Sequence, residues 1–325
     1  MKSNPSFRRK KNRNQVNPKQ LSPVGGFPLT KSLTVAELLK GYHGLGLQAS
    51  HIAHACELIR KIKAEKVPIF LTLTSNIISS GLREIIAQLV KERAIAAIIT
   101  TTGAIEEDLI KIKAPFHLGS FDDDDAELKK AGMNRIGNIL VADEQYCDFE
   151  EWHMAFLKKV HAGQRVIAPS EYIRKLGQSV QDRNSYLYRA AKNNIPVFCP
   201  GIVDGAMGDH VYFFNKSHKK DPFIFDVNAD VEKLYDIILQ PDKIAGYIVG
   251  GGIAKHHLIG AAILRDGLDY AIYITTSTQY DGSLSGARPK EAVSWNKLKD
   301  VNNSVCIEAE ASIVFPLLAW AMLHQ

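Results

Sequence analysis

From Val67 to the end of the chain, short apolar runs alternate with segments of helical periodicity, and this alternation constrains the fold more than any other feature. The run VPIFLTLT precedes a helical pattern at about residues 79–93, and AIAAIITT precedes another at about 105–113. Later apolar runs are PVFCP, FIFDV, residues 244–249, DYAIYIT and SVCIEA. Continuous apolar strands joined by helices are typical of a parallel sheet that is covered on both faces. The sequence therefore predicts an α/β fold with a Rossmann-like, mainly parallel sheet and helices on both faces.

A helical lead-in is predicted before this pattern, over residues 35–63, with a polar break at Gly44 and Gly46. The stretch GLGLQAS at this break superficially suggests a dinucleotide-binding glycine loop. No predicted strand precedes it, however, and the third glycine of that fingerprint is missing. We therefore expect a helical region without a role in cofactor binding.

The positive charge of the chain is concentrated at its amino-terminal end. The first twenty residues hold seven of the 40 Lys and Arg residues and none of the 35 Asp and Glu residues, so the remainder is nearly neutral although the whole chain has a net charge of +5. We expect residues 1–25 to form a basic, disordered tail, with weak contact to RNA or an acidic surface as the alternative. No linker divides the rest, so residues 26–325 are predicted to form a single domain.

Cysteine usage and hydropathy bear on the compartment. Cys56, Cys147, Cys199 and Cys306 lie far apart without a Cys-x-x-Cys pair, which argues against a zinc knuckle and fits a reducing cytosol. The longest apolar run, residues 313–323, is shorter than the roughly 20 residues that cross a bilayer. The amino-terminal end is polar and does not resemble a secretory signal. We therefore expect a cytoplasmic protein that does not contact membranes.

Ligands of parallel α/β sheets bind where the carboxyl ends of the strands form a crevice. All the predicted strands except FIFDV are followed by small, hydroxyl or acidic residues. These residues include Thr74–Asn76, Ser79–Gly81, Thr101–Gly103, Glu106–Asp108, Asp204, Asp209, Gly250–Gly252, Thr275–Ser277 and Glu310–Ser312. Each Ser or Thr is also an ordinary helix N-cap. A glycine triplet at a helix start suits a pyrophosphate, and an acidic residue such as Glu310 suits ribose hydroxyls, so the pattern favours NAD, although no GxGxxG fingerprint is present.

Carboxylates form a second set in the predicted crevice: Glu106, Glu107, Asp204, Asp209 and Glu291, with Tyr273 and Trp295 near them in the sequence. Each one alone is most simply a solvated loop carboxylate, as are Asp122–Asp125. Several carboxylates that converge between aromatic walls would instead bind a linear polycation.

Two histidines, His256 and His257, follow the glycine triplet. His256 could act as a general base near neutral pH. The pair could alternatively bind a metal, but no further ligand lies at suitable spacing, and no metal site is predicted.

The stretch DGSLSGARPKEAVSWNK, residues 281–297, places Lys297 two residues after Trp295. A lysine beside a tryptophan is often a surface charge whose methylenes cover the ring. The alternative is a Schiff-base lysine, which needs a desolvating pocket to lose its proton and act as a nucleophile.

Several motifs resemble those of the deoxyhypusine synthase family. They are TSNIISSG at 74–81, TTGAIEEDLIK at 101–111, NRIGNILV at 134–141, GGGIAKHH at 250–257, DGSLSGARPKEAVSW at 281–295 and ASIVFPLL near the end. The likeness covers the body of the chain from about Thr34 onward. Within the family, the chain resembles an archaeal-type member. The resemblance implies an NAD-dependent transfer of the aminobutyl group of spermidine, through an imine on Lys297, to a lysine of the hypusine-bearing translation factor. It also implies a homotetramer with active sites shared between two subunits.

The resemblance also implies roles for individual residues, with Lys297 as the nucleophile. Cofactor contacts would be Ser75, Asn76, Ser79, Thr101, Thr102, Gly103, Glu107, Asp204, Gly251, Thr276, Ser277, Glu310 and Ala311. Contacts to the amine would be Glu106, Glu107, Asp209, His256, Gly282, Ser283, Glu291 and Trp295.

Three positions depart from the eukaryotic pattern of the family. Leu284 replaces an aspartate, Gly260 an asparagine and Glu310 an aspartate. The first two fall among the amine contacts and leave the amine donor open. One alternative is therefore a homospermidine synthase-like enzyme that transfers the aminobutyl group to a free diamine. A third hypothesis, motivated by the basic tail, is a non-enzymatic scaffold that binds NAD or RNA.

Overall fold

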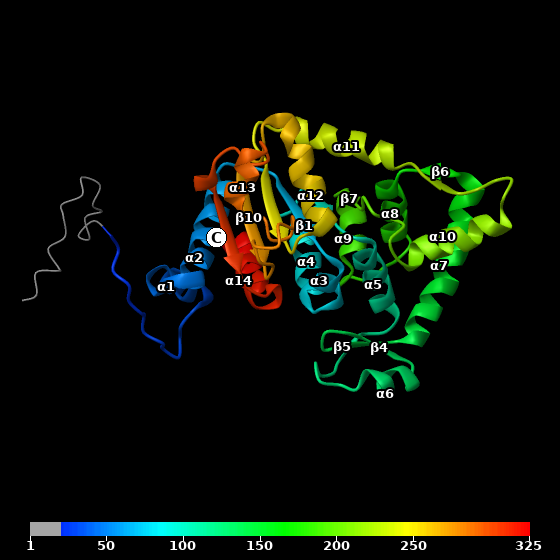
Figure 1. The fold of residues 1–325 in the computed structure, drawn as a ribbon, viewed down its shortest axis with the longest axis horizontal. Helices are drawn as coiled ribbons and strands as arrows, with labels where there is room; N and C mark the ends of the chain where they lie inside the picture. The colour runs from blue at the N-terminus through cyan, green and yellow to red at the C-terminus, as the bar shows by residue number, and fades with distance from the viewer. Residues whose placement is uncertain (1–20) are drawn as a thin grey trace, which may run out of the picture.

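A parallel sheet lies at the centre of the computed structural model, which describes residues 21–325 (Figure 1). The strand order is β11-β10-β9-β1-β2-β7, and every neighbouring pair is parallel. The strands are β1 (Ile69–Leu73), β2 (Ala97–Ile99), β7 (Val197–Phe198), β9 (Ala245–Val249), β10 (Tyr270–Thr275) and β11 (Ser304–Glu308). All six come from the apolar runs that predicted them, so the α/β prediction is confirmed. The first twenty residues of the predicted tail lie outside the described residues.

Helices cover both faces of this sheet because each strand is apolar on both sides. In β1, Ile69, Leu71 and Leu73 point into a core formed with α2 (Leu47–Ala64), α4 (Leu82–Lys91), α5 (Thr102–Lys113) and α14 (Ala311–His324). Phe70 points the other way, into a core with α11 (Val227–Leu239), α12 (Gly252–Ala261) and α13 (Pro289–Ser294). The period of two along the strand thus fills both layers. In Figure 1, α11 lies at the upper edge, and α12 and α13 lie below it in the upper half of the molecule.

The predicted lead-in forms two helices, α1 (Val35–Leu45) and α2. Thr34 and Glu37 form a capping box that starts α1. The break falls at Gly46, whose φ of 76° favours glycine, whereas Gly44 stays within α1. GLGLQAS thus spans the end of α1, the break at Gly46 and the first turn of α2.

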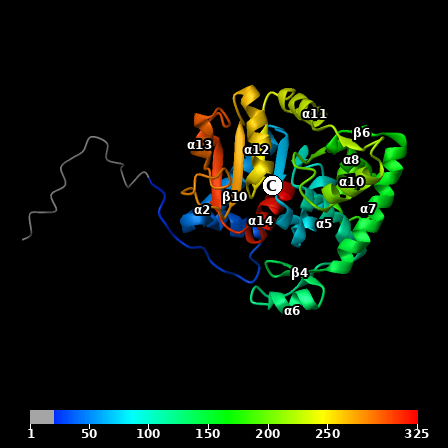
Figure 2. The same cartoon turned by 45° about the vertical axis from the view of Figure 1, so that its right-hand side comes forward.

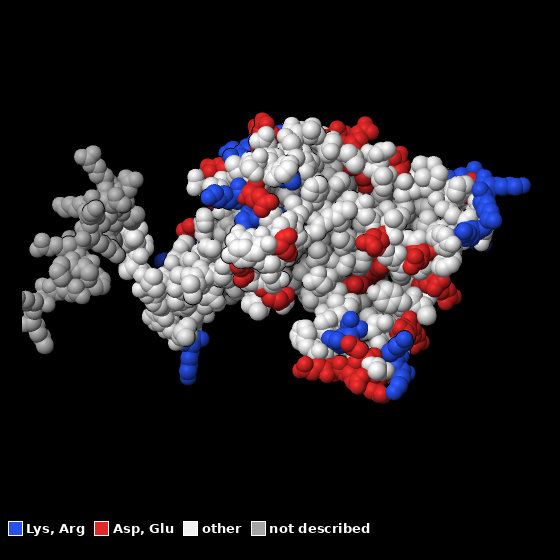
Figure 3. Space-filling model, viewed as in Figure 1, with Lys and Arg blue, Asp and Glu red and all other residues white. Residues whose placement is uncertain are grey.

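Two parts of the chain differ from the predicted pattern. FIFDV contributes β8 (Ile224–Phe225), which leaves the main sheet and pairs with β6 (Val166–Ile167). Residues 117–142 form an antiparallel sheet of β3 (His117–Leu118), β5 (Ile139–Ala142) and β4 (Met133–Ile136), and α6 (Asp125–Lys130) packs beside it at the lower edge of Figure 1. Asp122, Asp124 and Asp125 are exposed there, within the acidic area in the lower part of Figure 3. These three are solvated, as predicted, whereas Asp123 is half-buried and accepts a hydrogen bond from the Ser120 N–H.

The helical pattern at 79–93 divides into α3 (Ser75–Ser79) and α4, since Ser80 is extended and Gly81 precedes the new helix. α7 (Asp143–Gly163) runs along one side of the molecule in both ribbon views (Figures 1 and 2). α8 (Pro169–Gln178), α9 (Tyr186–Asn193) and α10 (Ala206–Ser217) complete the helices, with 3-10 turns at Ala262–Arg265 and Val301–Asn303. Within residues 21–325, no helix is both long and apolar enough to cross a bilayer.

Candidate functional site

Hydroxyl groups meet at the carboxyl ends of β1 and β2. The hydroxyls of Ser75 and Thr101 lie 2.7 Å apart, and the hydroxyl of Ser79 donates to the carboxylate of Glu107. A Cβ atom at Gly103 would lie 2.7 Å from the Ser75 hydroxyl oxygen, so only glycine fits beside it. We call Ser75, Ser79, Thr101, Glu106 and Glu107 the strand-end group. The structure thus brings together residues from two neighbouring strand ends, as the sequence predicted.

Two adjacent carboxyl groups of α5 are buried in this group. Glu106 accepts a hydrogen bond of 2.6 Å from the backbone N–H of Met207 at the start of α10. Burial raises the pKa of Glu106 to about 7, the Met207 hydrogen bond opposes this, and the nearby carboxylates of Asp209 and Asp204 raise it further. Burial also raises the pKa of Glu107 to about 7, against the effects of Ser79 and Lys111. Both carboxyl groups therefore change charge near neutral pH.

The other predicted cofactor and amine contacts at the strand ends differ in exposure. Thr102 is buried and donates to the Gly201 carbonyl over 2.7 Å, whereas Asn76, Asp204, Asp209 and Thr276 are exposed. Glu310 caps α14 by accepting from the Ser312 N–H at 2.9 Å, and Ala311 is the first residue of that helix. Ser277 N–H donates to the Thr275 hydroxyl over 3.0 Å.

The glycine triplet after β9 forms a tight start to α12. Gly250 and Gly252 have φ values of 82° and 64°. A Cβ atom at Gly251 would collide with Ser285, and the N–H of Gly252 donates to the Ser285 hydroxyl at 2.9 Å. Ser285, from the loop after β10, therefore already uses one of the amides that the sequence assigned to a pyrophosphate.

Lys297 is not at the carboxyl ends of the strands. Its carbonyl oxygen accepts from the N–H of Leu268 at 3.1 Å, and Leu268 and Leu298 form a parallel bridge just before β10 begins. This differs from the expected single crevice. The reason is that α13 leads the chain back across the face of the sheet, from the end of β10 to its start.

A cavity of about 260 Å³ contains the Lys297 side chain, and we call it the lysine cavity. It is lined by Lys255, His256, Ile259, Tyr273, Gly282, Leu284, Ala287, Arg288, Glu291, Ala292, Trp295 and Lys297. The Lys297 amine lies 5.2 Å from the centre of the Trp295 ring. Lys297 is 9% exposed and Trp295 is 62% exposed, so the ring forms an outer wall and the amine is shielded from solvent.

The sequence assigned no role to Lys255, which is also buried in this cavity. Its ammonium group donates to the carbonyl oxygens of Leu284 at 2.7 Å and Ala287 at 2.8 Å, and lies 4.9 Å from the centre of the Tyr273 ring. Burial lowers the pKa of Lys255 to about 8, and the positive charge of Lys297 is among the smaller contributions. Its place on the apolar side of a predicted helix was the signal in the sequence that could have identified Lys255 as a buried lysine.

Of the other predicted amine contacts, His256, Gly282 and Glu291 line the lysine cavity, and Ser283 follows Gly282 in the chain. His256 and Glu291 are exposed, and Gly260 lies close to His256 because a Cβ atom there would be 3.7 Å from Cε1 of the ring. Gly282 and Ser283 belong to an exposed turn in which Ser283 N–H donates to Asp281 at 2.7 Å.

The lysine cavity is lined mainly by cations, whereas the residues at and beside the strand-end group are acidic. Lys255, Arg288 and Lys297 line the lysine cavity with Glu291 as its one carboxylate, whereas Glu106, Glu107, Asp204 and Asp209 do not line it. An amine shielded from solvent inside such a cavity is placed to attack a carbonyl or an imine carbon, and water is kept from the product. Among residues 21–325, no three His, Cys, Asp or Glu side chains are grouped so that they could hold a metal ion.

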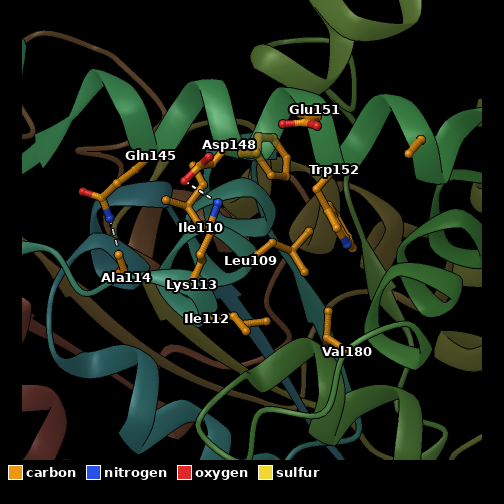
Figure 4. Close-up of a pocket in the computed structure, with 12 residues that line it drawn as sticks. Leu109, Ile110, Ile112, Lys113, Ala114, Gln145, Asp148, Glu151, Trp152 and Val180 are labelled. Atoms are coloured by element: carbon orange, nitrogen blue, oxygen red, sulfur yellow. Dashed lines mark hydrogen bonds and ion pairs between the residues drawn. The ribbon is translucent and has the colours of Figure 1, made fainter.

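A separate cavity of about 570 Å³ lies between α5 and α7 (Figure 4). Leu109, Ile110, Trp152 and Val180 make most of it apolar, and an ion pair of 2.5 Å between Lys113 and Asp148 lies at its edge. None of the predicted site residues lines this cavity.

Comparisons with known proteins agree on one family. The family model described as deoxyhypusine synthase matches residues 37–322. Relatives called "Probable deoxyhypusine synthase" from Pyrococcus furiosus and Methanocaldococcus jannaschii are each 43% identical to this chain; the alignments cover 91% of this chain and 92% and 94% of theirs. A crystal structure from Entamoeba histolytica that bears the same enzyme name has a similar fold, with a TM-score of 0.65, 24% identity, and coverage of 92% of this chain and 96% of that one.

Proposed function

This chain belongs to the deoxyhypusine synthase family, and we propose that it transfers the aminobutyl group of spermidine to a lysine of the hypusine-bearing translation factor. The observation that carries this proposal is the Lys297 amine, shielded behind Trp295 in a cavity that it shares with the buried cation Lys255. These surroundings shield the amine from water, as a lysine that carries a substrate as an imine requires. Because the acceptor is a translation factor, we propose a cytoplasmic location.

In this proposal NAD binds at the strand-end group. The paired hydroxyls of Ser75 and Thr101, the close approach of Gly103 and the carboxyl of Glu107 offer small and polar contacts that fit a dinucleotide. When bound, NAD supplies the reversible oxidation that converts an amine into an imine. The wider set of proposed contacts is Asn76, Ser79, Thr102, Asp204, Gly251, Thr276, Ser277, Glu310 and Ala311.

In this proposal each residue of the lysine cavity has its own role in the transfer. Lys297 attacks the imine carbon and holds the aminobutyl group while the leaving amine departs. His256 lies at the mouth of the cavity and takes up and returns a proton as the general base. Glu291 receives the terminal ammonium of the bound chain, and Trp295 packs against its methylenes and limits access of water to the imine.

The charge distribution supports a site built from two copies of the chain. Even without Lys297, the cations Lys255 and Arg288 outnumber Glu291, the one carboxylate that lines the lysine cavity, so alone it would repel a polyamine. The carboxylates that a polyamine needs, Glu106, Glu107, Asp204 and Asp209, lie in or beside the strand-end group. We therefore propose that the strand-end group of one subunit faces the lysine cavity of a second subunit, within a homotetramer.

A homospermidine synthase-like activity is the second candidate, and Leu284 favours it. Its apolar side chain lines the lysine cavity where the eukaryotic pattern has an aspartate, and Glu291 is the one carboxylate among the lining residues. The enzyme, NAD and labelled spermidine should be incubated with either the purified translation factor or putrescine. Label on the factor supports deoxyhypusine synthesis, whereas label found only in the product from putrescine would replace it with the second candidate.

A further inference from the structure

Lys111 makes an unusual set of contacts beside the strand-end group. Its ammonium group donates to three backbone carbonyls, those of Ile78 at 2.8 Å, Ser79 at 2.6 Å and Ser80 at 2.9 Å. All three donors of the ammonium group are therefore satisfied. The carbonyls belong to the end of α3, where the chain turns extended at Ser80, and a cation there neutralises helix carbonyls that lack partners.

Lys111 and Glu107 lie one turn apart on α5 and hold the same serine from two sides. Glu107 accepts from the hydroxyl of Ser79, and Lys111 donates to the carbonyl oxygen of Ser79. The Lys111 ammonium also lies 5.2 Å from the centre of the Phe116 ring, which shields it from water. The position of Ser79 thus depends on both residues.

We propose that Lys111 is a positioning residue of the dinucleotide site, which holds the end of α3 so that Ser79 stays bonded to an ionised Glu107. This inference rests on the proposed NAD site. Lys111 does not touch the ligand in this arrangement and acts through Ser79 and Glu107.

The surrounding charges make the effect of Lys111 measurable. Glu107 is near Glu106 on its own helix, Ser79 on α3 and Tyr146 on α7, while Arg83, Glu84 and Asp108 are near Lys111. Burial raises the pKa of Glu107 and the charge of Lys111 lowers it. Without that charge the pKa of Glu107 rises further, so the ionised carboxylate, which accepts hydrogen bonds from ribose hydroxyls, is present only at higher pH.

The test compares NAD binding by calorimetry for the full-length protein and three variants across the neutral pH range. Lys111→Met removes the charge, Lys111→Arg keeps it, and Lys113→Met is the matched control because Lys113 is exposed on the same helix and pairs with Asp148. We expect Lys111→Met to weaken NAD binding about tenfold, the effect of one hydrogen bond to a charged group, and to move the midpoint of its pH dependence upward. Lys113→Met should match the wild type.

Lys111→Arg should bind NAD more weakly with an unchanged midpoint, because a planar guanidinium cannot reach three converging carbonyls. The proposal is overturned if Lys111→Met keeps the wild-type midpoint, whether or not its affinity falls. If Lys111→Met does not fold, wild-type affinity in Lys111→Arg overturns it instead. A wild-type protein that binds no NAD would refute the proposed function itself, which is a distinct result.

Discussion

The ammonium nitrogen of Lys255 lies 2.7 Å from the carbonyl oxygen of Leu284, so a buried charge on α12 holds the loop that leads from β10 toward Lys297. A second hydrogen bond, to Ala287, fixes the same loop three residues later. The loop forms one wall of the lysine cavity. The geometry around Lys297 therefore depends on a residue that need not react.

Replacing Lys255 with Met should lower the rate of aminobutyl transfer at least about tenfold, since two charge-assisted hydrogen bonds to the loop are lost. Burial lowers the pKa of Lys255 to about 8, so the charge that makes these bonds is lost as the pH rises above that value. Wild-type activity should accordingly fall on the alkaline side in single-turnover assays over pH. An unchanged transfer rate in Lys255→Met would show that the loop holds its position without this charge.

Complementation between inactive variants tests the shared site. Lys297→Ala and Glu106→Gln should each abolish or strongly reduce transfer, and co-expression of the two chains should restore activity because each mixed pair contains one intact site. The matched control combines Lys297→Ala with Glu291→Gln, whose positions both line the lysine cavity. That combination should stay inactive. Equal activity in the two mixtures would argue against a site made by two subunits.

The buried pair of histidines should make the free energy of unfolding depend on pH. His153 Nδ1 lies 2.9 Å from His210 Nδ1, and burial lowers the pKa of both rings, that of His153 to about 3 from 6.5. The folded state thus binds fewer protons than the unfolded state, and this contribution is complete above pH 6.5 and is lost as the pH falls toward 3.

Urea unfolding of the wild type and of the double variant His153→Leu/His210→Met, at several pH values, measures this contribution. The free energy of unfolding of the double variant should fall less steeply with acid than that of the wild type. If the free energy of unfolding fell equally steeply with acid in both proteins, the histidine pair would not be the source of this pH dependence. Glu106 and Glu107, whose raised pKa values act in the opposite direction, are present in both proteins and cancel in the comparison.

A buried ion pair ties α4 to α5 beneath the strand-end group. Arg83 Nε lies 2.7 Å from Asp108 Oδ1, and both side chains are buried. Asp108→Ala should reduce the free energy of unfolding by about 3–5 kcal/mol because Arg83 keeps a buried charge without this partner. The control Glu92→Ala breaks the exposed pair with Lys91 and should change stability by less than about 1 kcal/mol. Similar losses for the two variants would contradict this ranking.

The sequence was sufficient to predict the central sheet because its strands are continuous apolar runs, of which residues 244–249 are an example. FIFDV has the same composition but forms two residues of a separate sheet, since strand partners depend on the whole topology. The position of Lys297 also could not be predicted from the sequence around it. It follows from the bridge between Leu268 and Leu298, a contact that no motif encodes.

The strand-end group could be predicted because parallel strands bring their carboxyl ends together, as Ser75 and Thr101 show. Lys255 could not be assigned a role, since its partners Leu284 and Ala287 come from a loop about thirty residues later and meet it only in the folded chain. The local motif GGGIAKHH contains the lysine but gives no sign of those carbonyls.

The central claim is that Lys297 carries the aminobutyl group during transfer. The most direct measurement is mass spectrometry of the full-length protein after treatment with borohydride in the presence of NAD and spermidine, since borohydride reduces an imine to a stable amine. We predict one added aminobutyl group on the peptide that contains Lys297, and none in Lys297→Ala. An unmodified Lys297 peptide in a protein that is active in transfer, or the same group found on another lysine, would contradict the account.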